Sequence, residues 1–189
     1  MTKLKLLMAL MLTAGTLTAG VFASYFKILQ TSGNDDANGW QLLVNGLVQS
    51  PLNLNLSELN AMPITTVNAV LYCVDLPNHP VAQGNWTGVK LNLLLGEAGV
   101  SSDAVKVAFT ATDGYTTDLT VQTAMRPDVI VAYELNGQPL PEKLRLVVPG
   151  KWGYKWISSL SKIELVNFDF KGMWESRGYS DEADIPSTP

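Results

Sequence analysis

The sequence is poor in metal-binding and redox side chains, because its 189 residues contain one cysteine, Cys73, and one histidine, His79. A single cysteine excludes an intrachain disulfide, and the two residues together are too few for a four-ligand Cys/His zinc site. They are also too few for an iron–sulfur cluster, and no Cys-x-x-Cys-His haem motif is present. Any function of Cys73 therefore operates without a second thiol.

Positive charge is also scarce, since 13 Lys and Arg residues stand against 17 Asp and Glu residues, for a formal net charge of −4. Binding to nucleic acid needs a basic face that neutralises phosphates, so this composition argues against such partners. Hydrophobic residues, by contrast, make up 47% of the chain, which is enough for the core of one domain. The expected partners are small molecules or proteins.

The first 26 residues have the pattern of an export signal. Lys3 and Lys5 precede a run from Leu6 to Phe26 that is interrupted only by hydroxyl and glycine residues. Such a run is either a cleaved signal, with Val21-Phe22-Ala23 as the cleavage site, or a membrane anchor, because about twenty residues span a bilayer. The two lysines favour the anchor. We expect residues 1–26 to place the protein outside the cytoplasm, membrane-anchored or secreted.

Beyond this segment, residues 27–39 are polar and small and predict a flexible tether. A folded domain is expected over residues 40–183, followed by a disordered tail over 184–189. Strands outnumber helices in this domain, so the expected class is α+β, mostly β. The expected strands cover residues 64–74, 104–112, 129–135, 144–148 and 163–168.

Turn and cap residues predict the remaining elements. A short hairpin is expected over residues 40–48 around Asn45-Gly46, and Asn136-Gly137 predicts a second turn. One helix is expected near 57–61, capped by Asn55 or Ser57, and another over 91–98, ended by Gly99. Residues 75–85 contain two prolines and a glycine and predict a loop. Trp174 and Tyr179 predict that the chain end packs back on the domain, because exposed rings leave apolar area unburied.

Several short motifs follow one another in a specific order. They are Leu71-Tyr72-Cys73-Val74-Asp75 with Trp86-Thr87-Gly88-Val89, the Asp113-Gly114-Tyr115 turn, residues 132–140 (AYELNGQPL), residues 144–156 (LRLVVPGKWGYKW) and residues 172–179 (GMWESRGY). With these motifs the chain resembles the sulfite-oxidase family of molybdenum enzymes, particularly its short prokaryotic members and the catalytic subunit of the periplasmic methionine-sulfoxide reductase. The resemblance covers residues 40–183 and implies the sulfite-oxidase-type molybdopterin-binding fold.

The resemblance also implies a molybdenum cofactor. Cys73, at the end of an expected strand, is the residue in the position of the metal ligand, beside the dithiolene sulfurs of one molybdopterin. A soft thiolate suits a metal that changes oxidation state. Arg145 and the loop formed by Lys151, Trp152, Gly153, Tyr154 and Lys155 are implied to bind the cofactor, through a guanidinium fork and backbone N–H groups that suit a phosphate.

Asp113 and Tyr115 are first of all turn residues, and we expect them near the active site with a catalytic role. For the other site residues the alternatives are that Cys73 is an inert buried residue and that Arg145, Lys151 and Lys155 are solvated surface charges.

These residues predict a two-electron oxidoreductase that transfers an oxygen atom to or from a small substrate such as sulfite or a sulfoxide. Electrons would be exchanged with a separate membrane-bound or exported electron-transfer protein, because the chain lacks a second redox site. An alternative is a cofactor-free extracytoplasmic binding module that retains the fold, which the lack of a twin-arginine pair before the apolar run favours. A third hypothesis pairs Cys73 with His79 as a thiol–imidazole hydrolase.

Overall fold

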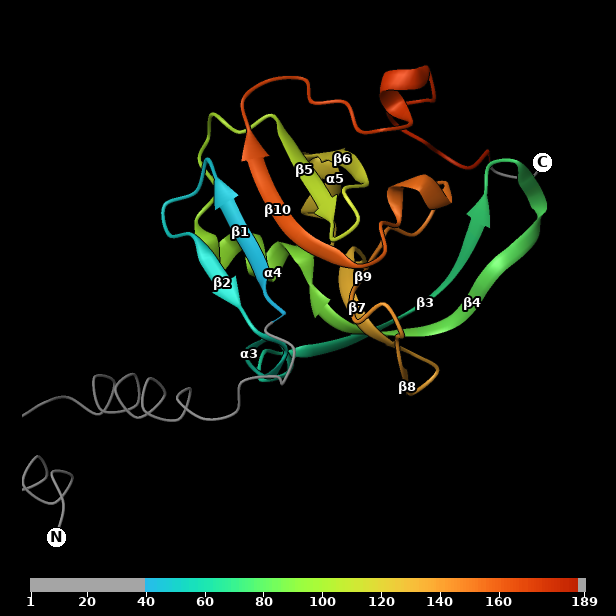
Figure 1. Ribbon diagram of the computed structural model, residues 1–189, viewed down its shortest axis with the longest axis horizontal. Helices are drawn as coiled ribbons and strands as arrows, with labels where there is room; N and C mark the ends of the chain where they lie inside the picture. Colours follow the sequence, from blue (N-terminus) through green and yellow to red (C-terminus); the bar gives the residue numbers. More distant parts are fainter. Residues whose placement is uncertain (1–39, 187–189) are drawn as a thin grey trace, which may run out of the picture. The chain divides into compact units, whose positions relative to one another are not determined.

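The structure is a computed structural model that describes residues 40–186 (Figure 1). The predictions for residues 1–26 and 27–39 lie outside the described residues. Within residues 40–186, no helix combines the length and the apolar character needed to cross a membrane. The described part consists of two five-stranded sheets and a few short helices, so the predicted class, α+β and mostly β, is confirmed.

The first sheet has the strand order β2-β1-β10-β5-β6. Its strands are β2 (Leu52–Leu54), β1 (Leu42–Gly46), β10 (Leu160–Val166), β5 (Lys106–Ala111) and β6 (Thr116–Thr120). β1 and β10 run parallel, whereas the other neighbours are antiparallel. Alternate residues of β1, Leu42 and Val44, are completely buried, which fixes the register because a shift of one residue would expose both.

The second sheet has the order β3-β4-β7-β8, and β9 pairs with the other edge of β7. Its strands are β3 (Ile64–Cys73), β4 (Leu76–Lys90), β7 (Ile130–Leu135), β8 (Gln138–Pro139) and β9 (Arg145–Val147). β3 and β4 form a long hairpin, and β7 pairs only with residues 86–90 of β4. The distal half of this hairpin therefore extends away from β7, as Figure 1 shows.

Three short α-helices connect the strands: α3 (Leu56–Asn60), α4 (Leu91–Ala98) and α5 (Val121–Ala124). Asn55 caps α3 through a reciprocal capping box with Glu58, and Gly99 ends α4 in a left-handed conformation with φ of 70°. Both features confirm the predicted caps. Asn136 and Gly137 also have positive φ values, of 53° and 75°, and form the predicted turn between β7 and β8.

Two predictions about local structure are wrong, and two elements have no counterpart in the predictions. The expected loop over residues 75–85 is the distal part of β4, where prolines are tolerated because β4 pairs only with β3 there and one edge is open. Asn45-Gly46 is the end of β1 rather than a hairpin turn, since the connection to β2 lies over residues 47–51. β6 and α5 were not anticipated, because the sequence of β6, TTDLT, is polar.

The chain after β10 packs back on the domain, as Trp174 and Tyr179 predicted. This C-terminal segment, residues 167–186, contains the 3-10 turn η2 (Glu175–Arg177) and is drawn in red in Figure 1. Its ordered contacts continue past the predicted boundary at residue 183, because Asp184 forms a bridge with Lys151 and the Ile185 N–H donates to the carbonyl of Gly150. Residues 184 and 185 are therefore part of the packed segment.

Candidate functional site

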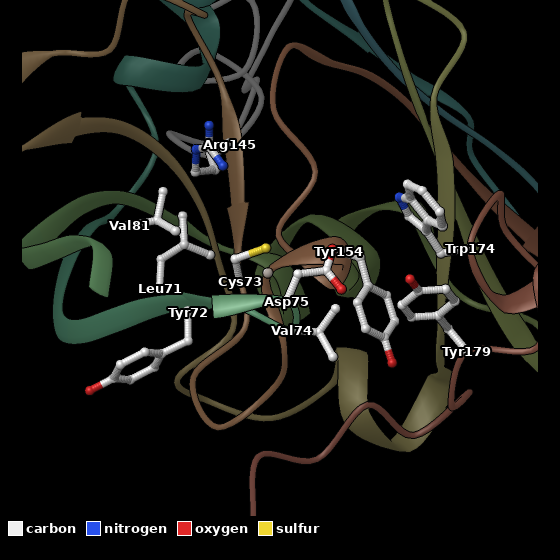
Figure 2. Close-up of a pocket in the computed structure, with 11 residues that line it drawn as sticks. Leu71, Tyr72, Cys73, Val74, Asp75, Val81, Arg145, Tyr154, Trp174 and Tyr179 are labelled. Carbon is white, nitrogen blue, oxygen red and sulfur yellow. The ribbon is translucent and has the colours of Figure 1, made fainter. Parts of the chain in front are cut away.

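Cys73 is the last residue of β3 and pairs with Leu76 across the tight Val74-Asp75 turn of the hairpin. Its thiol is free and half-buried. Figure 2 shows the sulfur directed into a cavity of about 310 Å³. The cavity is lined by Leu71, Tyr72, Cys73, Val74, Asp75, Val81, Arg145, Gly153, Tyr154, Trp174 and Tyr179. The end of a rigid hairpin thus holds the thiol at a space of small-molecule size.

Arg145, at the start of β9, brings a cation to the same cavity. Its Nε donates to a carboxylate oxygen of Glu142 at 2.7 Å, and its Nη1 donates to the carbonyl of Trp156 at 3.1 Å. These two bonds fix the plane of the guanidinium group. Within residues 40–186, Nη2 of Arg145 donates no hydrogen bond, so one edge of the fork is available for an anionic or polar oxygen.

The 3-10 turn η1 (Gly153–Lys155) lies directly against the end of β3. A side chain at position 153 would place its Cβ 2.7 Å from the carbonyl oxygen of Tyr72 and 2.9 Å from Cδ1 of Leu71. Only glycine permits this approach, since both distances are shorter than real Cβ contacts. The Gly153-Tyr154 backbone therefore reaches the neighbourhood of Cys73 because residue 153 lacks a side chain.

A second cavity of about 310 Å³ shares Arg145, Gly153, Tyr154 and Trp174 with the first. Asp113 and Tyr115 line this second cavity, so the structure brings them to the site region but not to the space around Cys73. Asp113 is exposed and accepts a hydrogen bond from the N–H of Tyr115 at 2.9 Å, which is its role in the turn.

Tyr115 and Tyr154 are both protonated donors at neutral pH. The Tyr115 hydroxyl donates to the carbonyl of Tyr154, and the Tyr154 hydroxyl donates to the carbonyl of Ser180, each at 2.7 Å. Burial, followed by the negative charge of Glu175, raises the pKa of Tyr115 and raises the pKa of Tyr154 to about 12. Both phenols therefore tie the site to its surroundings as neutral groups.

Three residues predicted to bind a cofactor, Lys151, Trp152 and Lys155, line neither cavity. Nζ of Lys151 pairs with Asp184 at 2.8 Å, and the N–H of Trp152 donates to the carbonyl of Ala183. Lys155 is completely buried, with Nζ 2.6 Å from Glu175. The ammonium groups of Lys151 and Lys155 thus contact acidic residues of the C-terminal segment, and Trp152 contacts the same segment through its backbone N–H.

Trp174 and Tyr179 line the first cavity but were not predicted as site residues. The ring centroids of Trp174 and Tyr179 are 5.1 Å apart, and those of Tyr154 and Tyr179 are 5.6 Å apart. In Figure 2 the three rings stand together on one side of the Cys73 sulfur. The pattern GMWESRGY could have predicted these two site residues, because it places two aromatic residues in a mostly polar segment outside the expected strands.

His79 is exposed on the distal part of β4 and lines neither cavity. The structure therefore does not bring Cys73 and His79 together as a thiol–imidazole pair. Within residues 40–186, no group of three or more His, Cys, Asp or Glu side chains is placed to hold a metal ion. Among the described residues, a metal at Cys73 would thus have at most two side-chain ligands of this kind and would have to bring most of its other ligands with it.

Comparison with known proteins identifies one family of oxidoreductases and several of its relatives. The family model described as "Oxidoreductase molybdopterin binding domain" matches residues 29–174. The chain is 32% identical over 149 residues to the putative protein-methionine-sulfoxide reductase subunit YedZ1 of Azospira oryzae, covering 77% of this chain and 56% of that protein. It is 30% identical over 161 residues to the uncharacterized oxidoreductase YuiH of Bacillus subtilis, covering 82% of this chain and 80% of that protein.

Among solved structures, the sulfane dehydrogenase SoxCD from Paracoccus pantotrophus has a similar fold. The TM-score is 0.61 at 25% sequence identity, and the match covers 69% of this chain and 39% of that chain. The chain thus spans well under half of SoxCD, a little over half of YedZ1 and most of YuiH.

Proposed function

We propose a function from the premise that this chain belongs to the oxidoreductase molybdopterin-binding domain family, whose cofactor is molybdopterin with its molybdenum. The chain is a molybdenum-dependent oxidoreductase in which Cys73 is the protein ligand of the metal. The observation that carries this proposal is the cavity of about 310 Å³ that contains the free thiol of Cys73 and the guanidinium of Arg145.

The residues of the cavity fit the cofactor in three respects. Cys73 offers one soft thiolate, and a dithiolene cofactor supplies the further sulfur ligands that the described side chains do not. Two cavities that share four residues provide an extended site for a ring system with a phosphate end. Among the residues that the structure describes, none accepts a hydrogen bond from Nη2 of Arg145, so this edge can bind that phosphate or a substrate oxygen.

When bound, the molybdenum cofactor supplies a centre that exchanges an oxygen atom and two electrons with the substrate. The chain's own residues do the rest. Arg145 provides positive charge in the cavity, and Leu71 and Val81 make part of its wall apolar. Asp113 and Tyr115 line the second cavity. The hydroxyl of Tyr115 donates to the carbonyl of Tyr154 and so holds that backbone in place.

The substrate is a small molecule that reacts at sulfur. For reaction at sulfur, the support is that one relative is named as a putative protein-methionine-sulfoxide reductase subunit and the structural neighbour as a sulfane dehydrogenase, so both names refer to sulfur chemistry. Reduction of a sulfoxide consumes two electrons and two protons and releases a thioether and water. Oxidation of sulfite takes its oxygen from water and releases two electrons and two protons. Either direction is compatible with the lining of the cavity.

Electrons are exchanged with a separate electron-transfer protein, since the chain has too few cysteines and histidines for a second redox centre. The location proposed for this exchange is outside the cytoplasm. Residues 1–26 direct export or anchor the chain in the membrane, and residues 27–39 connect this segment to the domain.

The test is the molybdenum content of the full chain produced in a host that makes the cofactor. We expect about one molybdenum and one pterin per chain, together with sulfoxide reduction or sulfite oxidation when a redox dye replaces the partner. A folded chain that contains neither molybdenum nor pterin would overturn the proposal and leave the cofactor-free binding module as the better hypothesis.

A further inference from the structure

The aromatic side of the Cys73 cavity is built by a segment that belongs to neither sheet. Trp174 and Tyr179 come from the C-terminal segment, whereas Cys73 and Arg145 come from strands. Trp174 lines both cavities and keeps 38% of its surface exposed, although it is one of the largest apolar side chains. An indole exposed at the opening of a cavity is apolar surface that a ligand can cover.

The segment is seated on β6 through backbone contacts around Trp174. The N–H of Met173 donates to the carbonyl of Thr116 at 2.9 Å. A Cβ at Gly172 would lie 2.4 Å from Cα of Thr117, so the two backbones are in direct contact. After Trp174 the chain turns sharply, because the N–H groups of Arg177 and Tyr179 both donate to the Trp174 carbonyl.

Glu175, next to Trp174, is the anchor of this turn. It is 6% exposed, and its Oε1 accepts from the Thr117 hydroxyl at 2.7 Å and lies 2.6 Å from Nζ of Lys155. Lys155 has 0% exposure, and its Nζ also donates to the backbone carbonyl of Asp118 at 2.9 Å. Lys155 Nζ also lies 3.3 Å from Oδ1 of the buried Asp118, whereas Lys155 is the cation that pairs with Glu175 among the described residues. Removal of Lys155 would therefore leave the Glu175 carboxylate buried without a cation, which is strongly destabilising.

The position of Lys155 in the sequence links the two sides of the site. It directly follows Tyr154, whose ring packs against Tyr179 at 5.6 Å, and it belongs to the turn η1 that approaches Cys73. The turn η1 thus provides the ring of Tyr154, which lines the cavity, and the ammonium of Lys155, which pairs with Glu175 of the C-terminal segment. Neither Lys155 nor Glu175 lines either of these two cavities.

We propose that the Lys155–Glu175 ion pair positions Trp174 and Tyr179 as the substrate-facing wall of the Cys73 cavity. Lys155 and Glu175 are positioning residues, and Trp174 contacts the substituent carried by the reacting sulfur. Aromatic rings suit this contact because sulfur and apolar groups pack favourably on them. The part concerning substrate rests on the proposed function, whereas the part concerning position does not.

The first experiment measures position by hydrogen exchange and needs no molybdenum. The N–H groups of Ser176, Arg177, Gly178 and Tyr179 are all bonded within the turn. In Glu175→Gln, which keeps the side-chain size, and in Lys155→Met, we expect these amides to exchange at least about tenfold faster than in the wild-type chain, while amides of β5 are unchanged.

The matched control is Lys171→Met. Lys171 lies in the same segment and pairs with Asp181 at 2.7 Å, but it is 37% exposed and touches neither Glu175 nor the rings. Exchange over residues 173–179 should stay within about twofold of the wild-type rate in this variant. If Lys155→Met does not fold, Glu175→Gln decides the question alone. Unchanged exchange in Glu175→Gln would overturn the positioning role.

The second experiment compares methyl phenyl sulfoxide with dimethyl sulfoxide on molybdenum-loaded enzyme. Trp174→Leu and Glu175→Gln should raise KM for the phenyl substrate by about tenfold and for the dimethyl substrate by less than about threefold, with kcat per molybdenum changed little. Equal KM changes for both substrates would overturn the wall assignment.

Loss of molybdenum from Lys155→Met with unchanged exchange would instead make Lys155 a cofactor ligand. A chain without molybdenum refutes the proposed function, yet the exchange result still decides the positioning.

Discussion

The two sides of the Cys73 cavity are built in different ways. On one side, Cys73 and Arg145 are held by the hydrogen-bond ladders of β3–β4 and β7–β9. On the other side, Trp174 and Tyr179 stand on an irregular segment that is held by ion pairs and a few backbone bonds. Ladders fix positions through many small contributions, whereas the buried charges of Lys155 and Glu175 concentrate the restraint in a few strong contacts. The strands thus suit residues whose position must stay constant for the reaction, and the C-terminal segment suits residues that determine which substrate binds.

The largest effect is expected on the sheet side, from Cys73→Ser. A hydroxyl is a hard and poor replacement for a thiolate, so this variant should retain no molybdenum and transfer no oxygen. Elemental analysis of the folded variant measures this directly. Asn78→Ser, an exposed change on the same hairpin, is the control and should keep its metal. Normal molybdenum content in Cys73→Ser would refute the ligand assignment.

On the segment side, Lys155→Met should cause the largest loss of stability. Glu175 would then be a buried carboxylate without its cation, which costs about 3–5 kcal/mol in the free energy of unfolding. The midpoint of thermal unfolding should therefore be lower by about 10 °C. The exposed control Lys171→Met should lose less than about 1 kcal/mol in the free energy of unfolding, which is a much smaller shift of the midpoint. Similar losses in the two variants would remove the contrast between buried and surface ion pairs.

Arg145→Ala should weaken cofactor retention without unfolding the domain. A charge-assisted bond to a phosphate contributes about 1.5–3 kcal/mol, which corresponds to about ten- to a hundredfold in affinity. Dialysis followed by molybdenum and pterin assay measures retention. Arg145→Lys should be intermediate, because an ammonium keeps the charge but loses the bond pattern of the fork. Full retention in Arg145→Ala would assign this residue to the protein surface.

The smallest effect concerns pH and the C-terminal segment. Burial would raise the pKa of Asp181, but hydrogen bonds from Lys106 and Lys171 outweigh it and lower that pKa. A folded-state pKa below the unfolded value means that the contribution to stability is complete above about pH 4 and is lost as the pH falls further. Unfolding free energies from pH 6 to pH 2 should decline below about pH 4, and Asp181→Asn should reduce this decline. A decline of equal size in Asp181→Asn would contradict the prediction.

Local signals in the sequence were sufficient for much of the sheet side. The β-branched residues of β3 predicted a strand that ends at Cys73, and Gly99 and Asn55 predicted the ends of two helices. These features depend on neighbours within a few residues. The family motifs added Arg145 and the turn that contains Gly153, both of which line the cavity.

The segment side was less predictable, because its contacts join residues far apart in the chain. Lys155 bonds to Asp118, 37 positions earlier, and no local pattern reveals that its ammonium turns away from the cavity. The same cluster explains why β6 was missed. Thr117 and Asp118 of that strand are completely buried although they are polar, since their side chains face Glu175 and the two lysines, Lys106 and Lys155.

The parallel pairing of β1 with β10 gives the chain a built-in order of assembly. β1 begins at Leu42, but its partner strand ends only at Val166, so the middle of the first sheet cannot close until most of the chain has been synthesised. Pairings over such sequence separations form slowly. The C-terminal segment follows β10 and can therefore dock on the domain only after that strand has been made. Until it docks, the cavity beside Cys73 lacks the wall that Trp174 and Tyr179 provide.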